Sequence, residues 1–150
     1  MGCDYQGYLV NKNDVYKYDY DKWWKNKPVF PKVDDRDAED YTPFLGDGSL
    51  IWKLFDYCNL NKITEHDSWI VVEINQQNID ILIDTCKSIL IESLDIKNKD
   101  DFENSKLKKF FWRYTEDISE DLCAMYRRFQ YVKEVLIKYP QHSFVVNINY

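Results

Sequence analysis

The stretch that most constrains the fold is Trp69–Ile74, with the sequence WIVVEI, in which five of the six residues are apolar. Successive side chains of a β-strand point to opposite faces of the sheet. A strand that is apolar at almost every position is therefore stable only where both of its faces are covered. The sequence predicts that Trp69–Ile74 is a central strand.

Two further β-prone runs near the start of the chain predict a hairpin. Tyr5–Val10 and Val15–Tyr20 are separated by the polar residues NKND, which suit a four-residue turn. If Val10 faces Val15, the alternation of the strands gathers one set of side chains on the face that helices would cover. That set is Tyr5, Leu9, Tyr16, Tyr18 and Tyr20.

Residues 143–149, SFVVNIN, predict a C-terminal strand in which Phe144, Val146 and Ile148 share one face. Apolar residues at helical spacing predict helices over about 49–58, 76–94, 103–114 and 117–139. Ser49 and Asn75 are the expected caps of the first two helices, and Asp117 with Glu120 resembles a capping box. The inward residues expected in the third are Leu107, Phe110, Phe111 and Tyr114.

These elements predict an α+β fold with about four strands, mostly antiparallel, and three or four helices on one face of the sheet. The strands are the N-terminal hairpin, the central strand 69–74 and the C-terminal strand 143–149. A length of 150 residues suits a single domain over 1–150.

The long segment Asp19–Ser49 carries an unusual concentration of acids. The chain has a net charge of −6, and residues 1–75 hold 14 acids against 9 bases. Within the segment, DDRDAED at 34–40 places five carboxylates around one Arg. A calcium-binding loop counted from Asp35 would need Gly at its sixth position and Glu at its twelfth, but Asp40 and Gly46 stand there. We expect no metal site and no cofactor.

Clustered carboxylates create a negative patch that steers association with a basic protein surface, and exposed aromatic residues supply anchors. The sequence therefore predicts a partner-binding site, for a basic protein such as a nuclease or a nucleic-acid-binding effector. Its residues are Trp23, Trp24, Asp34, Asp35, Asp37, Glu39, Asp40 and Asp47. A solvated loop, with both Trp residues covering the sheet edge, is the alternative.

Catalytic signatures are weak. The chain has two His residues, His66 before the central strand and His142 before the last one. They would lie at opposite ends of the sheet if those strands are antiparallel, and at the same end if parallel. Its four Cys residues are widely spaced, which does not suit a zinc site. Cys58 is expected in the core, so a nucleophilic thiol is disfavoured.

Basic residues could form a different interface. Lys106, Lys109 and Arg113 fall on one face of the expected third helix, with Lys108 beside them. Such a face is able to contact phosphates. Acids nearby in sequence favour a solvated, ion-paired face instead, and direct binding of nucleic acid is not the preferred interpretation.

The N-terminus resembles a targeting signal only in part. Gly2 and Cys3 suit an acylated anchor, but Gln6 stands where Ser or Thr is required. No signal peptide or membrane-spanning stretch is expected, and the cytoplasm is the expected location. The opening MGCD and the EDL at Glu120–Leu122 look like small uncharacterised proteins of phages and bacteria, a resemblance that implies no activity.

The acidic charge, small size and aromatic content are similar in general character to inhibitor proteins, including anti-CRISPR, other anti-defence and toxin-immunity proteins. The sequence thus favours a non-enzymatic protein that occludes a basic partner. Two alternatives stay open: a small enzyme or ligand-binding protein with a pocket between the Tyr-rich hairpin and the helices, and nucleic-acid binding through the basic helix face.

Overall fold

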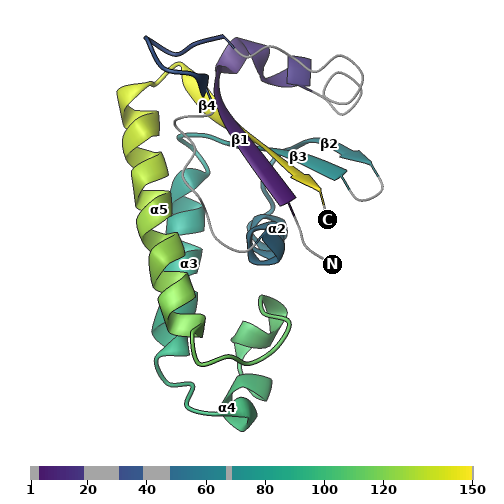
Figure 1. Cartoon of the computed structure of the whole chain (residues 1–150), viewed down its shortest axis with the longest axis vertical. Coiled ribbons are helices and arrows are strands. Elements are labelled where there is room, and N and C mark those ends of the chain that lie inside the picture. Colours follow the sequence, from purple (N-terminus) through teal and green to yellow (C-terminus); the bar gives the residue numbers. More distant parts are fainter. Residues whose placement is uncertain (1–3, 19–30, 39–47, 67–68, 150) are drawn as a thin grey trace.

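The computed structural model describes residues 4–18, 31–38, 48–66 and 69–149. Its strands are β1 (Asp4–Asn11), β2 (Lys62–His66), β3 (Trp69–Ile74) and β4 (His142–Asn149). They form one sheet in the order β1-β4-β3-β2, and every neighbouring pair is antiparallel. The C-terminal strand therefore lies between the first strand and the third (Figure 1).

The helices connect these strands and gather mainly on one side of the sheet (Figure 1). They are η1 (Lys12–Tyr18), α2 (Gly48–Tyr57), α3 (Ile79–Ser93), α4 (Lys99–Glu103), η3 (Lys106–Lys109) and α5 (Ile118–Lys138), where η denotes a 3₁₀ helix. The predicted α+β class with antiparallel strands is confirmed. So are the central position of β3 and the C-terminal strand.

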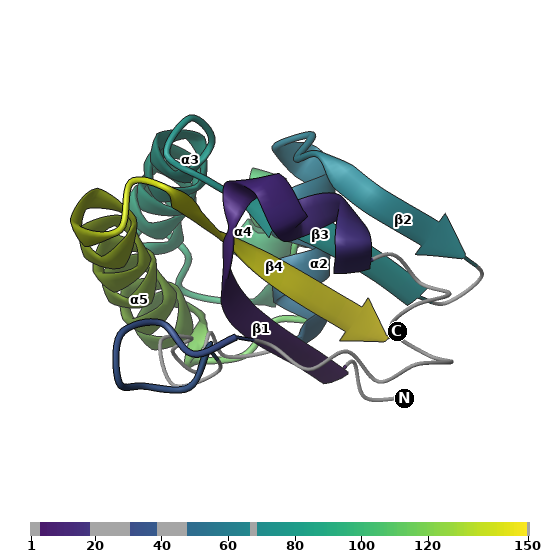
Figure 2. The same cartoon turned by 90° about the horizontal axis from the view of Figure 1, so that it is seen from above.

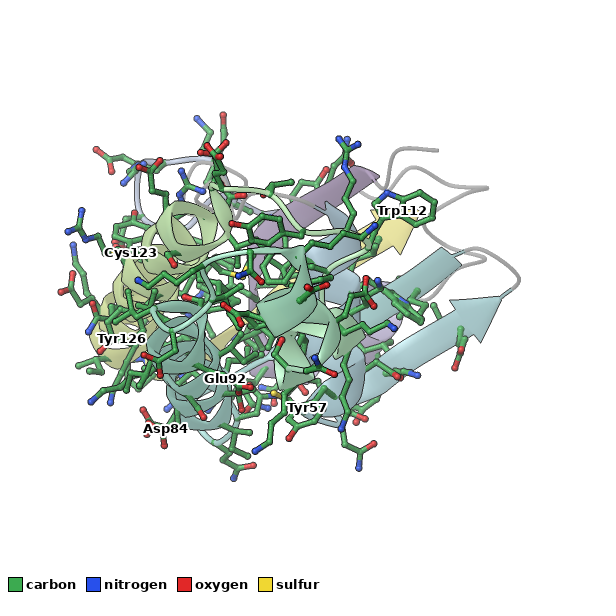
Figure 3. All side chains as sticks on the ribbon, turned by 90° about the horizontal axis from the view of Figure 1, so that it is seen from below. Tyr57, Asp84, Glu92, Trp112, Cys123 and Tyr126 are labelled. Atoms are coloured by element: carbon green, nitrogen blue, oxygen red, sulfur yellow. The ribbon has the colours of Figure 1, made fainter. Side chains whose placement is uncertain are left out.

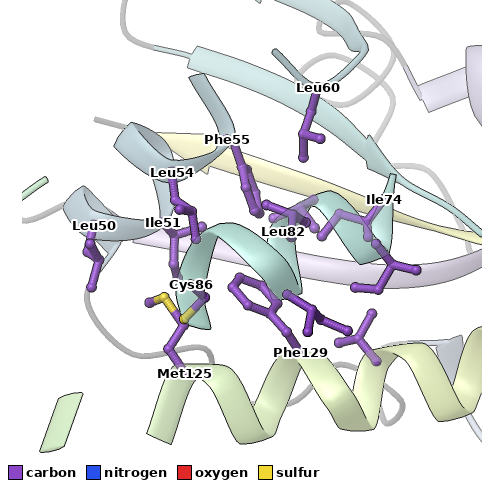
Figure 4. Close-up of a cluster of buried hydrophobic side chains, with 14 of the residues drawn as sticks. Leu50, Ile51, Leu54, Phe55, Leu60, Ile74, Leu82, Cys86, Met125 and Phe129 are labelled. Atoms are coloured by element: carbon purple, nitrogen blue, oxygen red, sulfur yellow. The ribbon is translucent and has the colours of Figure 1, made fainter. Parts of the chain in front are cut away.

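The main core lies between the sheet and the α2, α3 and α5 layer. Phe144, Val146 and Ile148 of β4 are buried in it, as the alternation of that strand predicted. The close-up in Figure 4 shows Phe129 and Met125 of α5 beside Leu82 and Cys86 of α3, with α2 above them. The heptad-like spacing of apolar residues in α3 and α5 thus produces one continuous helix-to-sheet core.

The predicted N-terminal hairpin is wrong. β1 pairs with β4 over its whole length, and residues 12–18 form η1 instead of a second strand. Asn11 starts the helical turn, because its side-chain oxygen accepts a hydrogen bond from the Asn13 N–H at 2.9 Å. An ion pair between Lys17 and Asp14, three residues apart, also fits helical geometry.

η1 lies across the face of the sheet opposite the long helices (Figure 2). Its Val15 is 1% exposed and packs in a second small core that is formed by the outward-facing residues of the strands. These are Val10, Val71 and Val145, with Tyr8 and Ile63 at the margin. The middle of the sheet is therefore buried on both faces.

Two predicted caps and one predicted helix also need correction. α2 already includes Ser49, and Asn75 initiates a separate turn before Asn78, the residue that precedes α3. Asp117 precedes α5 but makes no side-chain cap hydrogen bond. The helix expected over 103–114 is replaced by α4 and η3.

The break has a local cause. Asn98 caps α4 by accepting from the Asp101 N–H, and Ser105 caps η3 by accepting from the Leu107 N–H. A capping side chain at the third residue of the expected helix starts a new 3₁₀ turn there. Leu107 and Phe110 are nevertheless buried, as the apolar spacing predicted.

α3 and α5 pack as an antiparallel pair, fixed near both ends. At one end Lys133 Nζ lies 2.7 Å from a carboxylate oxygen of Asp80. At the other end the hydroxyls of Ser93 and Ser119 are 2.9 Å apart. Among the helices that the structure describes, none combines the length and apolar character needed to cross a bilayer.

Replacing Val15 with Ala tests the position of η1. We expect a loss of about 1.5–2.5 kcal/mol in the free energy of unfolding, because two buried methyl groups are removed. Tyr16→Ala, at a residue 67% exposed, should change it by less than about 0.5 kcal/mol. Urea denaturation measures both. The hairpin would bury Tyr16, so the reverse order of effects would contradict the observed fold.

Candidate functional site

The described part of the predicted acidic site, Asp34, Asp35 and Asp37, lies beside the corner that residues 139–141 form between α5 and β4. Gln76, just after β3, holds this corner through its side-chain amide. Its Nε2 donates to the carbonyl oxygens of Leu136 at 3.1 Å and His142 at 3.0 Å. The end of α5 and the start of β4 are thereby tied to the end of β3, so the corner has a fixed backbone.

An acidic turn, residues 33–38, lies beside this corner (Figure 1, dark blue, next to the C-terminal end of α5). Val33 and Arg36 exchange two backbone hydrogen bonds, of 2.9 and 3.1 Å, around Asp34 and Asp35. Asp34 has a φ of 54°, a left-handed conformation that Asp tolerates better than most residues. The turn is anchored on either side by Val33, 5% exposed, and Ala38, 2% exposed.

The three described carboxylates differ in their contacts. Asp34 accepts a hydrogen bond from the hydroxyl of Tyr139. Asp37 lies 3.9 Å from Lys32 Nζ, with both side chains more than half exposed, so solvent screens this pair strongly. Asp35 is exposed and makes no hydrogen bond or ion pair within the described residues. Within the described residues, this patch therefore keeps at least one carboxylate, Asp35, that no base neutralises.

Aromatic and basic groups surround the Asp34 contact. The ring of Tyr139 meets His142 edge-on at 5.8 Å between centroids, and Lys138 Nζ lies 5.3 Å from the Tyr139 ring centroid. Burial lowers the pKa of His142 below its usual value, while the nearby Asp34 carboxylate acts in the opposite direction. His142 is therefore neutral at pH 7.

Part of the predicted site lies outside the described residues: Trp23, Trp24, Glu39, Asp40 and Asp47. The structure brings Asp34, Asp35 and Asp37 together on one exposed turn. Sequence reasoning missed the neighbours Tyr139, His142 and Lys138, because they are about a hundred residues away in the chain. Only the pairing of β4 with β1 and β3 brings them to this edge.

A second candidate site lies at the other end of the α3–α5 pair, where α4 and η3 fold back (Figure 1, bottom). We call residues 97–114 the basic corner: this segment holds six Lys and Arg residues against three acids. Lys106, Lys109 and Arg113 do not share a helix face, because the helix that would align them is broken. Lys108 forms an ion pair of 2.7 Å with Glu103.

A cavity of about 500 Å³ opens in the basic corner. Its lining residues are Lys99, Glu103, Trp112, Arg113 and Tyr114. Trp112 is 87% exposed, and Figure 3, seen from below, shows its ring standing away from the helices. The pocket expected between a Tyr-rich hairpin and the helices has no hairpin to form it.

The spacing of the segment contained a signal for Trp112. If Leu107, Phe110, Phe111 and Tyr114 point inward, as predicted, then Trp112 and Arg113 are left outward. All four inward residues are buried or packed against the core. The sequence therefore allowed the prediction of an exposed Trp beside an Arg, but it did not allow the prediction of the cavity.

The groups considered for catalysis are separated or inert. Because β3 and β4 are antiparallel, His66 at the end of β2 and His142 at the start of β4 lie at opposite ends of the sheet. Burial raises the pKa of Cys58, and that of Cys86 to about 12, so both thiols stay protonated at neutral pH. No metal-binding group of three or more suitable side chains occurs in the described ranges.

The chain matches no protein family, no curated protein and no solved structure.

The lowered pKa of His142 predicts a pH-dependent stability. The unfolded chain binds this proton more readily than the folded one, so the stabilisation is complete above the unfolded pKa, about 6.5, and is lost as pH falls below it. The unfolding free energy of the native protein should therefore fall between pH 7 and 5.5. His142→Gln should reduce this slope. Equal slopes for His142→Gln and the native protein would contradict the assignment.

Proposed function

We propose that this chain is a non-enzymatic binding protein whose acidic turn docks on the basic surface of a partner protein. The observation that carries the proposal is the construction of the turn. Buried Val33 and Ala38 anchor it, and Asp35 projects from it with no hydrogen bond or ion pair to another described residue. A carboxylate held this way keeps its charge available to a cationic surface.

The rigidity of the turn supports recognition as well as attraction. Two backbone hydrogen bonds and the Tyr139 contact fix Asp34, so little conformational freedom is lost there when a partner binds. The ion pair between Lys32 and Asp37 is weak, because the two charged groups are 3.9 Å apart and exposed to solvent. An Arg of the partner is therefore able to replace Lys32. The turn thus suits a preorganised docking element.

The proposed partner class is a protein with a basic functional surface, such as a nuclease or a nucleic-acid-binding effector. Docking there would exclude the partner's own anionic ligand, which makes the mechanism one of steric and electrostatic occlusion. Trp23 and Trp24 are the sequence's candidates for the apolar anchors that charges do not provide.

Charge reversal at Asp35 and Asp37 tests the docking surface. Asp34 is left in place, because its φ of 54° and its contact with Tyr139 are structural. A basic partner should be retained by the native protein in co-purification from its host and lost by Asp35→Lys/Asp37→Lys. With the purified partner, the association rate constant should fall about tenfold or more at low ionic strength, and less in high salt.

A variant with the same net charge provides the control. Glu116→Lys/Glu134→Lys reverses two exposed carboxylates outside the turn and should retain the partner. Circular dichroism and urea denaturation verify that both variants fold. If both double variants bind equally, or if the affinity of the native protein is unchanged across a salt series, the proposed docking surface is wrong.

A further inference from the structure

The cavity of the basic corner brings three kinds of group together. An exposed indole, two cationic side chains and one carboxylate line the same space, which measures about 500 Å³. This volume falls within the range of ordinary ligand sites. Each group restricts the chemistry of a suitable ligand, and together they define one class.

Trp112 supplies a flat, exposed surface for stacking. An indole that is 87% exposed contributes almost nothing to the core of this protein. Its support comes from its neighbours, since Phe111 and Tyr114 pack against the core on either side. An aromatic ring held in this way suits a planar aromatic ligand, such as a nucleobase.

Lys99 and Arg113 supply the positive charge beside that surface. The Arg113 guanidinium makes no hydrogen bond or ion pair within the described part of the chain, and its fork of donors matches a phosphate. Lys99 lies at the start of α4 and lines the same cavity. A stacking ring next to such cations is the usual combination in sites for single-stranded nucleic acid.

Glu103 adds an acceptor for the edge of a base. Lys108 contacts its Oε2 at 2.7 Å, and this hydrogen bond, with the nearby charge of Lys99, lowers the pKa of Glu103. The carboxylate is therefore ionised at neutral pH, and Oε1 is not used by Lys108. A carboxylate accepts well from the exocyclic amino group of cytosine.

We propose that this cavity is a binding site for a nucleobase and its attached phosphate, with the base stacked on Trp112 and the phosphate held by Arg113 and Lys99. Glu103 favours bases that carry an amino group. The same chemistry is present in a free nucleotide and in an unpaired residue of a single strand. The site is independent of the acidic turn, which lies at the opposite end of the α3–α5 pair.

Fluorescence anisotropy of a labelled ten-residue oligodeoxycytidine at low ionic strength tests the site, with unlabelled CMP as competitor. We expect the oligonucleotide to bind the native protein. Trp112→Ala should weaken this binding about five- to hundredfold, the range of one base stack. Competition by CMP at millimolar concentration would identify a free nucleotide as sufficient, and its absence would identify the single strand as the ligand.

Matched controls separate the cavity from general charge effects. Tyr16→Ala removes another exposed aromatic ring, and Arg127→Ala removes another exposed Arg, both outside the cavity. Both should bind like the native protein, whereas Arg113→Ala should bind more weakly and with a shallower salt dependence. Oligothymidine, which lacks the amino group, should bind more weakly than oligodeoxycytidine, and Glu103→Gln should reduce that preference.

Three results would overturn the proposal. The first is no binding of oligodeoxycytidine at low ionic strength. The second is equal binding by Trp112→Ala and the native protein. The third is displacement of the oligonucleotide by a poly-glutamate peptide as effectively as by unlabelled oligodeoxycytidine, since that outcome identifies the corner as a site for acidic protein segments.

Discussion

The insertion of β4 between β1 and β3 is the contact on which the rest of the structure depends. Four apolar residues of this strand are almost completely buried, three toward the helices and Val145 toward η1. Burial of one such side chain contributes about 1.5–3 kcal/mol, so together they approach the whole net stability of an ordinary domain. The sheet is therefore incomplete until the last residues of the chain have been placed.

This arrangement determines where both candidate sites lie. Because β4 begins at the end of the sheet where β3 finishes, the turn from α5 must reach that end, and Gln76 holds it there. At this corner, Asp34 of the acidic turn accepts a hydrogen bond from Tyr139. The antiparallel pairing of α3 with α5 sends the connection between them, with α4 and η3, to the far end. The two sites are thus separated by the length of a long helix.

Sequence patterns predicted the elements whose apolar residues repeat without interruption. Trp69–Ile74 was recognised from its nearly continuous apolar run, and α3 and α5 from apolar residues that repeat with a period of 3.6. The predictions failed where short polar side chains compete with the backbone. The hydrogen bond to the Asn11 side chain starts η1 where a hairpin was expected. The hydrogen bond to the Ser105 side chain starts η3 where a continuous helix was expected. Such local hydrogen bonds leave the apolar spacing unchanged, so periodicity does not reveal them.

The candidate sites were predictable to different degrees for a related reason. The acids at 34–37 are neighbours in sequence, and their concentration was visible without a structure. Their contacts with Tyr139 and His142 depend on strand pairing across more than a hundred residues. Trp112 was visible as an outward position, whereas its cavity requires Lys99 and Glu103 from α4, which are brought close by the break at Ser105.

The two candidate sites lie too far apart for the charges of one to influence the other. α5 has 21 residues, and at 1.5 Å per residue it separates the acidic turn from the basic corner by about 30 Å. At physiological ionic strength the Debye length is about 8 Å, so the field of one end is almost fully screened at the other. The segment 97–114 holds six Lys and Arg residues against three acids, but Glu92 accepts a hydrogen bond from the Lys106 N–H, so the positive charge at this end is confined to the surroundings of Lys99 and Arg113 in the cavity. The two proposed interactions, with a basic protein at one end and with a nucleotide phosphate at the other, would therefore be electrostatically independent.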